Sequence, residues 1–408
     1  MRAVGLITEY NPFHAGHEYH LAQAKALSGA DIAIVVMSGN FVQRGIPAMY
    51  DKWKRAKMAV QNGVDLVIEL PVAFSIQPGP FFAKGAVEIL LAAGVDTIIF
   101  GAEHAEWNFM KLAEQVREST QQAAEFHNYK QTFASNFNAV LLDELGISIQ
   151  DPNDLLGLSY ALAVLELGAQ DQVMIRAIQR KGQAYHSTQI SQESFVSASG
   201  IRNALKNKSM QTKVLHSLPI GTQSLLLEPP FLDYEQPMWQ LLYYKVMTTP
   251  VEQLEKIYQL NDGLAYRLLD IIGHSPSGHQ VDWNTFMQCF KSKRYTYSRL
   301  QRSILYTLLN VSEAEMQIAL QKPYLRVLAF NSKGQLWLKH QRKDFNLPVI
   351  SKVNQNNLQE YLKLDLRAGR LYNILNNRGD NMPQDTNRQP YRLPKPSPER
   401  NENDEMEF

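Results

Sequence analysis

The first residues that can do chemistry are two histidines on either side of a glycine. His14 and His17 flank Gly16 within the run Asn11-Pro12-Phe13-His14-Ala15-Gly16-His17. An apolar run precedes these residues and helical periodicity follows them, so we expect a turn between a strand and a helix. Glycine lets the backbone approach a ligand at a helix N-terminus, where free N–H groups and the helix dipole attract phosphate. Two imidazoles placed there can donate hydrogen bonds to a triphosphate as charge builds on its leaving oxygens.

Two other interpretations of these histidines stay open. His14, His17 and His20 are spaced by three with Glu18 beside them, which would suit a zinc site. The zincin pattern H-E-x-x-H is not met, because His17-Glu18-Tyr19-His20 is one residue short. The simplest interpretation is that the histidines cap a helix or lie on the surface. We favour phosphate binding and predict no metal ligands, since H-x-G-H between a first strand and a helix is typical of nucleotidylyltransferases and class I aminoacyl-tRNA synthetases.

A second anion-binding pattern lies far downstream, in Ser197-Ala198-Ser199-Gly200-Ile201-Arg202. A turn rich in Ser and Gly that opens a helix can form an anion nest, and Arg202 one turn later can reach phosphate in a bidentate manner. Alone, this pattern would be interpreted as the N-cap of a surface helix. Together with the first pattern it favours phosphate binding, so we predict catalytic roles for His14, His17 and Arg202 and a ligand contact for Ser197.

Three further candidates follow or flank predicted strands. The loop Ser38-Gly39-Asn40-Phe41-Val42-Gln43-Arg44-Gly45 contains Arg44 as a candidate anion clamp, and Asn153 and Arg180 are placed to hold adenine or ribose. Each of these residues alone is more often a helix cap or a solvated surface group.

A basic segment lies in the C-terminal half of the chain. Residues 291–302 contain five Lys or Arg, no acidic residue and two tyrosines. This combination suits an RNA backbone and an unstacked base, although a solvated basic helix face is an equally good interpretation of an isolated run. The predicted RNA contacts are Lys291, Lys293, Arg294, Tyr295, Tyr297, Arg299 and Arg302. Cys289, the only cysteine, lies beside this segment.

The elements that must position these residues alternate in type. Apolar runs of strand length occur at 3–7, 31–37, 65–70, 97–100 and 173–178, with helical stretches between them. Such alternation predicts an α/β fold, a Rossmann-like doubly wound parallel sheet of the nucleotidylyltransferase type followed by a mostly helical C-terminal domain. Doubly wound sheets bind ligands outside the carboxyl ends of their strands, where the candidate residues fall.

The domain boundaries follow from shifts in pattern. We expect a catalytic domain over 1–208 with a helical excursion at 104–150, and a mainly helical domain over 209–377 with a small strand pair at 325–330 and 335–339. Residues 378–408 hold five of the 19 prolines, many charges and almost no aliphatic residues, so we expect a disordered tail.

Composition narrows the class of protein. A net charge of +1 from 41 basic and 40 acidic residues excludes a globally basic protein that coats nucleic acid. Any polyanionic ligand must therefore bind to local basic patches. The single Cys cannot form an intramolecular disulfide. The N-terminus does not resemble a signal peptide and no apolar run is long enough to span a membrane, so we expect a cytoplasmic protein.

Four longer runs resemble the bacterial tRNA(Met) cytidine acetate ligases. They are residues 5–17 (GLITEYNPFHAGH), 38–45 (SGNFVQRG), 64–71 (VDLVIELP) and 151–157 (DPNDLLG), and the basic runs 293–296 and 299–302 also match. The resemblance covers residues 1–310 well and the rest loosely. The chain departs from the family at Ala15, Ala102 and Gly200, none of which removes a charged group or a histidine.

The resemblance implies an ATP-dependent ligase that forms acetyl-adenylate from acetate and acetylates N4 of the wobble cytidine in elongator tRNA(Met). The implied partners are acetate and the tRNA anticodon loop, and Mg²⁺ would accompany ATP. The implied nucleotide contacts are Ile7, Thr8, Glu9, Tyr10, Asn11, Pro12, Phe13, His14, Gly16, His17, His20, Gly101, Asn153, Gln179 and Arg180. Two alternatives remain, a nucleotidylyltransferase that acts on a small phosphorylated substrate and a non-catalytic tRNA- or ribosome-binding protein.

Overall fold

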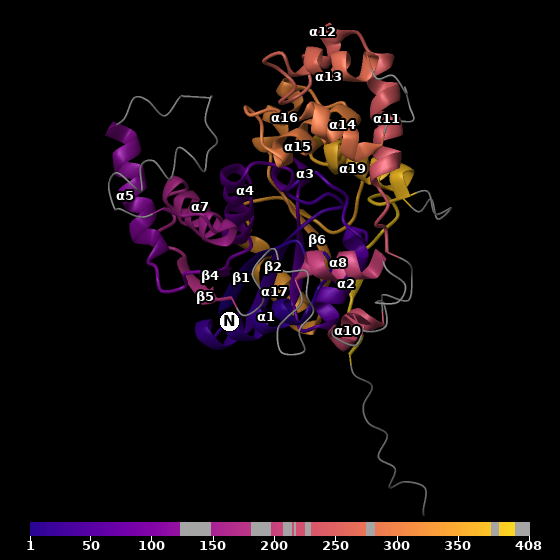
Figure 1. Cartoon of the computed structure of the whole chain (residues 1–408). Coiled ribbons are helices and arrows are strands. Elements are labelled where there is room, and N and C mark those ends of the chain that lie inside the picture. Colours follow the sequence, from indigo (N-terminus) through magenta and orange to yellow (C-terminus); the bar gives the residue numbers. More distant parts are fainter. Residues whose placement is uncertain are drawn as a thin grey trace, which may run out of the picture.

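Eight strands form one sheet through the middle of the molecule (Figure 1), in the order β5-β4-β1-β2-β3-β6-β7 with β8 paired to β6. This computed structural model describes residues 1–122, 148–180, 197–206, 214–215, 218–224, 230–274, 282–376 and 383–395. The first five strands are β1 (Ala3–Thr8), β2 (Ile32–Ser38), β3 (Leu66–Leu70), β4 (Thr97–Ala102) and β5 (Met174–Gln179). All pairings among these five are parallel, which confirms the predicted Rossmann-like sheet.

Alternate residues of the inner strands enter two different cores. In β2, Ile32, Ile34 and Val36 face one apolar cluster, whereas Ala33, Val35 and Met37 face the other. This is the period of two that a strand buried on both faces requires. The strands therefore need helices on both sides of the sheet.

Helices cover both faces. The helices α4 (Gly79–Ala92) and α7 (Pro152–Glu166) pack on one face with α5 (Phe109–Gln122) beside them. On the other face lie α1 (Ala15–Ser28), α2 (Lys52–Gln61) and α8 (Ala198–Lys206), with α10 (Ile220–Gln223) against α2. The short α3 (Val72–Ser75) follows β3.

A second group of helices, here called the helical half, lies above the carboxyl ends of the strands in Figure 1. It comprises α11 (Glu235–Met247), α12 (Val251–Leu254), α13 (Leu264–Gly273), α14 (Trp283–Phe290), α15 (Tyr297–Leu309), α16 (Glu313–Leu320) and α19 (Lys363–Asn376). Its core also takes in Phe41 from the loop after β2, together with Val72, Ala73 and Ile76 from α3 and its C-terminal end. The helical half is thus packed directly on the edge of the sheet where ligands of this fold class bind.

The C-terminal part of the chain returns to the sheet. The strand β6 (Leu325–Phe330) pairs antiparallel with β3, and β7 (Val349–Ile350) and β8 (Tyr391–Arg392) pair parallel with β6. The predicted strand at 335–339 is wrong, because these residues lie in α17 (Ser332–His340), whose Trp337 is buried against the sheet. The helices η2 (Gln341–Lys343) and α18 (Gln355–Glu360) complete the described elements. A domain boundary at 208/209 stays a prediction, although three strands beyond it belong to this sheet.

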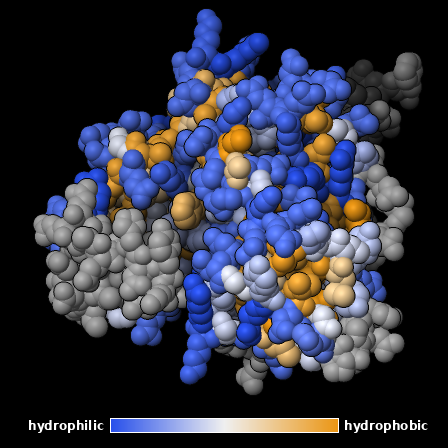
Figure 2. Space-filling model, turned by 90° about the horizontal axis from the view of Figure 1, so that it is seen from above, coloured by the Kyte–Doolittle hydropathy of each residue, from blue (hydrophilic) through white to orange (hydrophobic). Residues whose placement is uncertain are grey.

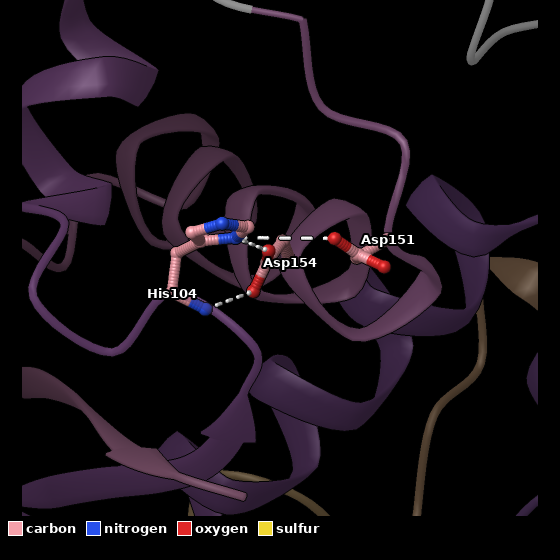
Figure 3. Close-up of side chains that lie close together, drawn as sticks. All are labelled: His104, Asp151 and Asp154. Atoms are coloured by element: carbon pink, nitrogen blue, oxygen red, sulfur yellow. Dashed lines mark hydrogen bonds and ion pairs between the residues drawn. The ribbon is translucent and has the colours of Figure 1, made fainter. Parts of the chain in front are cut away.

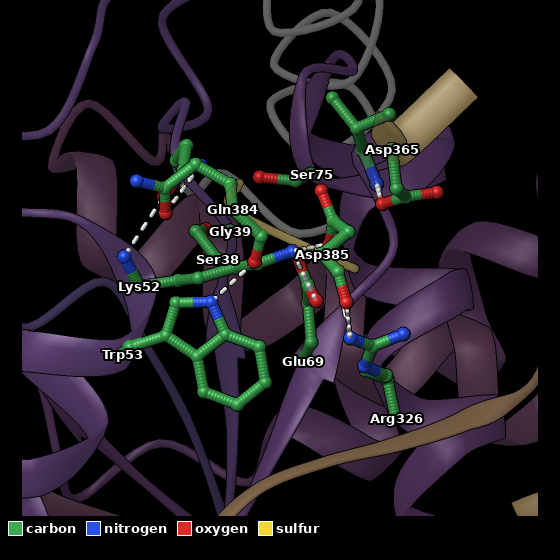
Figure 4. A network of polar contacts seen from close by, with 12 residues as sticks. Ser38, Gly39, Lys52, Trp53, Glu69, Ser75, Arg326, Asp365, Gln384 and Asp385 are labelled. Atoms are coloured by element: carbon green, nitrogen blue, oxygen red, sulfur yellow. Dashed lines mark hydrogen bonds and ion pairs between the residues drawn. The ribbon is translucent and has the colours of Figure 1, made fainter. Parts of the chain in front are cut away.

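Residues 383–395 are folded, in contrast to the disorder that their composition predicts. A network of buried charges holds them in place (Figure 4): Lys52 Nζ lies 2.8 Å from Glu69 Oε1 and 2.5 Å from Asp385 Oδ1. The Arg326 guanidinium also donates to the Asp385 carbonyl oxygen at 3.2 Å. Ion pairs and hydrogen bonds to the sheet therefore replace the apolar packing that this segment lacks. The predicted tail residues 378–382 and 396–408 lie outside the described residues.

The surface of the helical half is mostly hydrophilic, with hydrophobic side chains in separate patches (Figure 2). Among the described helices, none has the length and apolar character needed to cross a membrane.

Candidate active site

His14 and His17 form the N-terminal cap of α1 at the carboxyl end of β1. His14 is the N-cap residue, and its Nδ1 accepts the backbone N–H of Gly16 at 3.1 Å. In return, His17 Nδ1 accepts the backbone N–H of His14 at 3.3 Å, and the two rings stack with 3.7 Å between their centroids. This reciprocal arrangement is a capping box built from imidazoles. The capping interpretation of the H-x-G-H run is correct, and it leaves a ligand role available.

The hydrogen bonds fix the state of both rings. Because each Nδ1 accepts from a backbone N–H, each neutral ring carries its proton on Nε2 and has that N–H left as a donor. Burial, followed by the charges of Arg180 and Arg202, lowers the pKa of His14 to about 3. Burial also holds the pKa of His17 well below its ordinary value, with His14, His20 and Arg180 adding to the effect. The site therefore presents neutral donors among fixed positive charges.

Arg202 and Arg180 reach this place from two distant parts of the chain. Arg202 in α8 donates from Nη1 to the carbonyl oxygen of Asn11 at 2.7 Å, which ties α8 to the loop after β1. Arg180 follows β5, and its charge acts on His14, His17 and His20 alike. The two guanidinium groups and the histidine pair thus converge at the point where β1 separates β2 from β4. Such a switch point is where doubly wound sheets bind nucleotides.

His20 has a different position. Its Nε2 lies 3.2 Å from the carbonyl oxygen of Ile99 in β4, so this nitrogen donates and ties α1 to the sheet. Burial lowers the pKa of His20 to about 4. Each of the three rings bonds to the backbone through one nitrogen, Nδ1 in His14 and His17 and Nε2 in His20. These rings do not belong to the one group with metal-ligand character found among the described residues.

Glu103, which is not among the predicted site residues, organises the predicted adenosine contacts. Its Oε1 accepts from Asn153 Nδ2 at 2.6 Å and lies 3.5 Å from Arg180 Nε. Its carbonyl oxygen accepts from Gln179 Nε2 at 2.8 Å. A Cβ at Gly101 would lie 3.2 Å from Arg180 Cγ, so a glycine there gives the arginine side chain room to cross the end of β4. The sequence signal that could have identified Glu103 is its position directly after β4.

The rest of the predicted nucleotide loop divides by burial. Thr8, Asn11, Tyr10, Pro12 and Phe13 are buried, whereas Ile7, Glu9 and Gly16 are half-buried. Tyr10 packs edge-on against Phe13 and His17, with centroids 4.7 and 4.8 Å apart. The buried members therefore hold the loop in shape, and Glu9 Oε1 accepts from the backbone N–H of Gln43 in the loop after β2.

Ser197 precedes α8, as predicted. Its Oγ accepts the backbone N–H of Gly200 at 3.1 Å and lies 3.1 Å from Ser199 Oγ. This is the N-cap interaction that the sequence offered as the alternative to an anion nest.

One group with metal-ligand character is present among the described residues: His104, Asp151 and Asp154, whose ligand atoms lie within 4.8 Å of one another (Figure 3). Hydrogen bonds satisfy the carboxylate of Asp154, the buried member of this group. Asp154 Oδ2 lies 2.6 Å from His104 Nδ1, and its Oδ1 accepts from the backbone N–H groups of Glu103 and His104. The group thus anchors the Glu103 segment to the first turn of α7.

The basic segment at the start of α15 is partly exposed. Lys291, Lys293, Arg294 and Tyr297 are exposed and Arg299 is half-buried. Tyr295 and Arg302 are buried instead, which corrects their prediction as RNA contacts. Tyr295 packs in the helical half, where Arg294 and Arg299 lie over its ring, whereas the backbone of Arg302 packs against Gly45.

The fold and this site define a nucleotide-binding α/β protein of the HxGH class, and the sequence agrees. Residues 1–388 match the family described as HIGH Nucleotidyl Transferase, so the chain belongs to that family. Within it, the chain belongs to the tRNA(Met) cytidine acetate ligases. It is 46% identical to the ligase of Leuconostoc mesenteroides over 93% of this chain and 96% of the relative, and 41% identical to that of Limosilactobacillus reuteri over 92% and 96%.

A solved structure supports the same relationship. Thermotoga maritima TmcAL bound with alpha-thio ATP superimposes with a TM-score of 0.83 at 29% identity, over 96% of this chain and 100% of the other. The family suggested by the runs at 5–17, 38–45, 64–71 and 151–157 is confirmed.

Proposed function

We propose that this protein is an ATP-dependent ligase that forms acetyl-adenylate from free acetate and acetylates N4 of the wobble cytidine of elongator tRNA(Met). The observation that carries the proposal is the pair of Nε2–H donors on His14 and His17, placed beside Arg180 and Arg202 at the switch point of the sheet. Relatives named for this activity, at 40–46% identity, support the choice of substrates. We place the reaction in the cytoplasm, where ATP and tRNA are both present.

In the first step, an acetate oxygen attacks the α-phosphorus of ATP. The new P–O bond forms as the bond to the bridging oxygen of pyrophosphate breaks, and negative charge collects on the leaving group. His14 and His17 donate to that charge, and Arg202 neutralises it from α8. Donors that are held in place before the reaction begins stabilise such a transition state without reorganising.

In the second step, N4 of cytidine attacks the carbonyl carbon of acetyl-adenylate, AMP leaves, and N4 loses a proton. The lone pair of N4 is delocalised into the ring, so the amine is a poor nucleophile. Holding the two reactants in contact can contribute about 7–11 kcal/mol in favourable cases. The base must leave its stack to reach the adenylate, which a single-stranded anticodon loop permits at low cost.

The other predicted residues have supporting roles. Asn153, Gln179 and Arg180 hold the adenosine portion of ATP, and Glu103 keeps them in position. Lys291, Lys293, Arg294, Tyr297 and Arg299 contact the tRNA. Mg²⁺ would enter with the phosphate oxygens of ATP, which are among its preferred ligands, because the His14 and His17 rings present N–H donors.

The test is acetate-dependent ATP–pyrophosphate exchange with a His17→Asn variant. Asparagine keeps an acceptor near the place of Nδ1, so the cap of α1 is retained while the Nε2–H donor is lost. We expect exchange that requires acetate in the wild-type protein and falls by about 10²–10³-fold in the variant. His274→Asn, at an exposed histidine that ends α13, is the matched control and should leave exchange unchanged.

The RNA step is measured with labelled acetate and a tRNA(Met) transcript. A transcript with uridine at the wobble position lacks the acceptor amine and should stay unlabelled. Exchange driven by a small phosphorylated substrate in place of acetate would favour the nucleotidylyltransferase alternative. RNA binding with neither exchange nor labelling, unchanged by His17→Asn, would favour the binding-protein alternative.

A further inference from the structure

Tyr234 lies at the boundary between the sheet domain and the helical half, as the N-cap residue of α11. Two hydrogen bonds connect its segment to the loop after β1. The N–H of Phe231 donates to the carbonyl oxygen of Met49 at 2.8 Å, and the N–H of Met49 donates to Asn11 Oδ1 at 2.9 Å. Asn11 is also the residue whose carbonyl oxygen binds Arg202. Tyr234 is therefore held a few contacts away from the proposed catalytic arginine.

The environment of Tyr234 is polar on one side and aromatic on the other. Its half-buried ring packs edge-on against Phe231, with 6.3 Å between the centroids. Its hydroxyl is within electrostatic reach of Arg202, Glu235 and Tyr297. Burial, followed by Glu235, raises the pKa of Tyr234 to about 12, so the hydroxyl stays protonated at neutral pH and can both donate and accept.

Tyr297 extends this line of aromatic groups to the basic segment. It is the first residue of α15, and 40% of it is exposed. Its hydroxyl interacts with the Trp283 side chain and is within electrostatic reach of Glu235, the residue that follows Tyr234. The exposed cations Lys291, Lys293 and Arg294 come shortly before Tyr297 in the chain. Tyr297 and Tyr234 are thus both within electrostatic reach of Glu235, and Tyr234 is also within reach of Arg202.

We propose that Tyr297 and Tyr234 position the acceptor base of single-stranded RNA: the ring of Tyr297 stacks on the unstacked base, and the Tyr234 hydroxyl bonds to the base edge beside the adenylate. This inference rests on the proposed function and adds to it two positioning residues and a route for the base. An exposed tyrosine ring accepts any base face, and the nearby cations bind the flanking phosphates. The inward hydroxyl then selects the orientation that presents N4.

The experiment uses the full-length protein and a tRNA(Met) transcript with three variants. Tyr297→Leu removes the stacking ring, Tyr234→Phe removes only the hydroxyl, and Tyr266→Leu changes a comparably exposed tyrosine on α13 as the control. We expect Tyr297→Leu to raise KM for tRNA by about 5–100-fold, the range that base stacking on an aromatic side chain supports. Tyr234→Phe should lower kcat for acetyl transfer and leave KM nearly unchanged. Acetate-dependent ATP–pyrophosphate exchange is measured in parallel, and Tyr266→Leu should keep the wild-type rate.

A spectroscopic signal separates positioning from a structural effect. A fluorescent cytidine analogue at the wobble position should be quenched on binding to the wild-type protein and to Tyr266→Leu, but not to Tyr297→Leu. Unchanged unfolding midpoints show that the variants fold. If the wild-type protein acetylates tRNA and Tyr297→Leu and Tyr234→Phe match it in every measurement, the inference is wrong and the proposed function stands. If the wild-type protein neither exchanges nor acetylates, both fail.

Discussion

The His14 ring accepts the backbone N–H of Gly16, the His17 ring accepts the backbone N–H of His14, and the two rings stack with 3.7 Å between their centroids. The four residues from His14 to His17 therefore start α1 and place two N–H donors at the carboxyl end of β1. A serine or aspartate would cap the helix equally well. What imidazole adds is a second nitrogen, which can donate to a ligand while the first accepts from the backbone.

The histidine pair predicts that ATP binding takes up protons. In the free protein, burial and the charges of Arg180 and Arg202 keep the pKa of His14 at about 3, so the ring is neutral at neutral pH. A bound triphosphate brings negative charge beside the ring and raises that pKa. The added proton enters at Nδ1, where it displaces the hydrogen bond from the Gly16 N–H. Because the complex then holds more protons than the free protein, the contribution of His14 to ATP affinity grows as the pH falls.

Calorimetric titration with ATP measures the number of protons taken up, when it is repeated in buffers of different ionisation enthalpy. The titration is done at about pH 6, below the unperturbed pKa of histidine. His14→Asn, which keeps an acceptor for the Gly16 N–H, is the comparison, and subtracting its proton uptake also removes the contribution of ATP itself. Equal proton uptake by the variant and the wild-type protein would contradict the prediction.

Much of this site could be predicted from sequence because its signals are local. The H-x-G-H run, the strand before it and the helix after it lie within thirty residues, so periodicity and turn chemistry suffice to place His14 and His17. The position of Arg180 required only that parallel strands end at one edge of the sheet. Glu103 was missed because its role is to hold Asn153 and Arg180, and those contacts exist only in the fold.

Glu103 should control ATP affinity without touching the phosphates. Glu103→Ala removes the acceptor for Asn153 and the partner of Arg180, so both side chains lose their fixed positions. A hydrogen bond to a charged group contributes about 1.5–3 kcal/mol, which corresponds to an ATP Kd raised by about 10–150-fold if all of it serves binding. Glu106→Ala, at an exposed carboxylate three residues away, is the matched control. An ATP Kd for Glu103→Ala equal to that of the control would rule the role out.

The end of the chain shows where composition misleads. Residues 383–395 have few aliphatic side chains, and low apolar content is the usual mark of disorder. Asp385 is nevertheless only 1% exposed, because Lys52 and Arg326 are buried in the sheet domain and need a counter-charge. Sequence separation of 333 residues hides this pairing. The strand predicted at 335–339 was wrong for a similar reason. Contact of this segment with the sheet favours a helix, and that contact exists only in the fold.

Asp385 should therefore be essential to stability. Asp385→Ala leaves Lys52 with Glu69 alone and Arg326 without its carboxylate, and breaking a buried ion pair costs about 3–5 kcal/mol. Urea denaturation measures the free energy of unfolding. Arg388→Ala breaks a more exposed contact of the same segment, 3.9 Å from Asp51, and should cost less than about 1 kcal/mol. A similar small loss for both variants would mean that the segment contributes little to the fold.

His104 makes the last prediction, which concerns pH. Its hydrogen bond with Asp154, at 2.6 Å, raises the pKa of His104 above the usual value, and the charges of Asp154, Glu106 and Asp151 act in the same direction. A histidine whose pKa is raised by folding adds stability that is full below its unfolded pKa and is lost as the pH rises through its folded pKa. The contribution is small because the side chain is 42% exposed. NMR titration of the ring should give a pKa above about 6.5, the unperturbed value.

Asp154→Asn is the informative variant for His104, because its amide oxygen can still accept from the backbone N–H groups of Glu103 and His104. The variant removes the negative charge and leaves the anchor of the Glu103 segment. We expect the pKa of His104 to fall toward the unperturbed value while ATP affinity changes little. Loss of ATP affinity together with an unchanged His104 pKa would contradict both parts of this prediction.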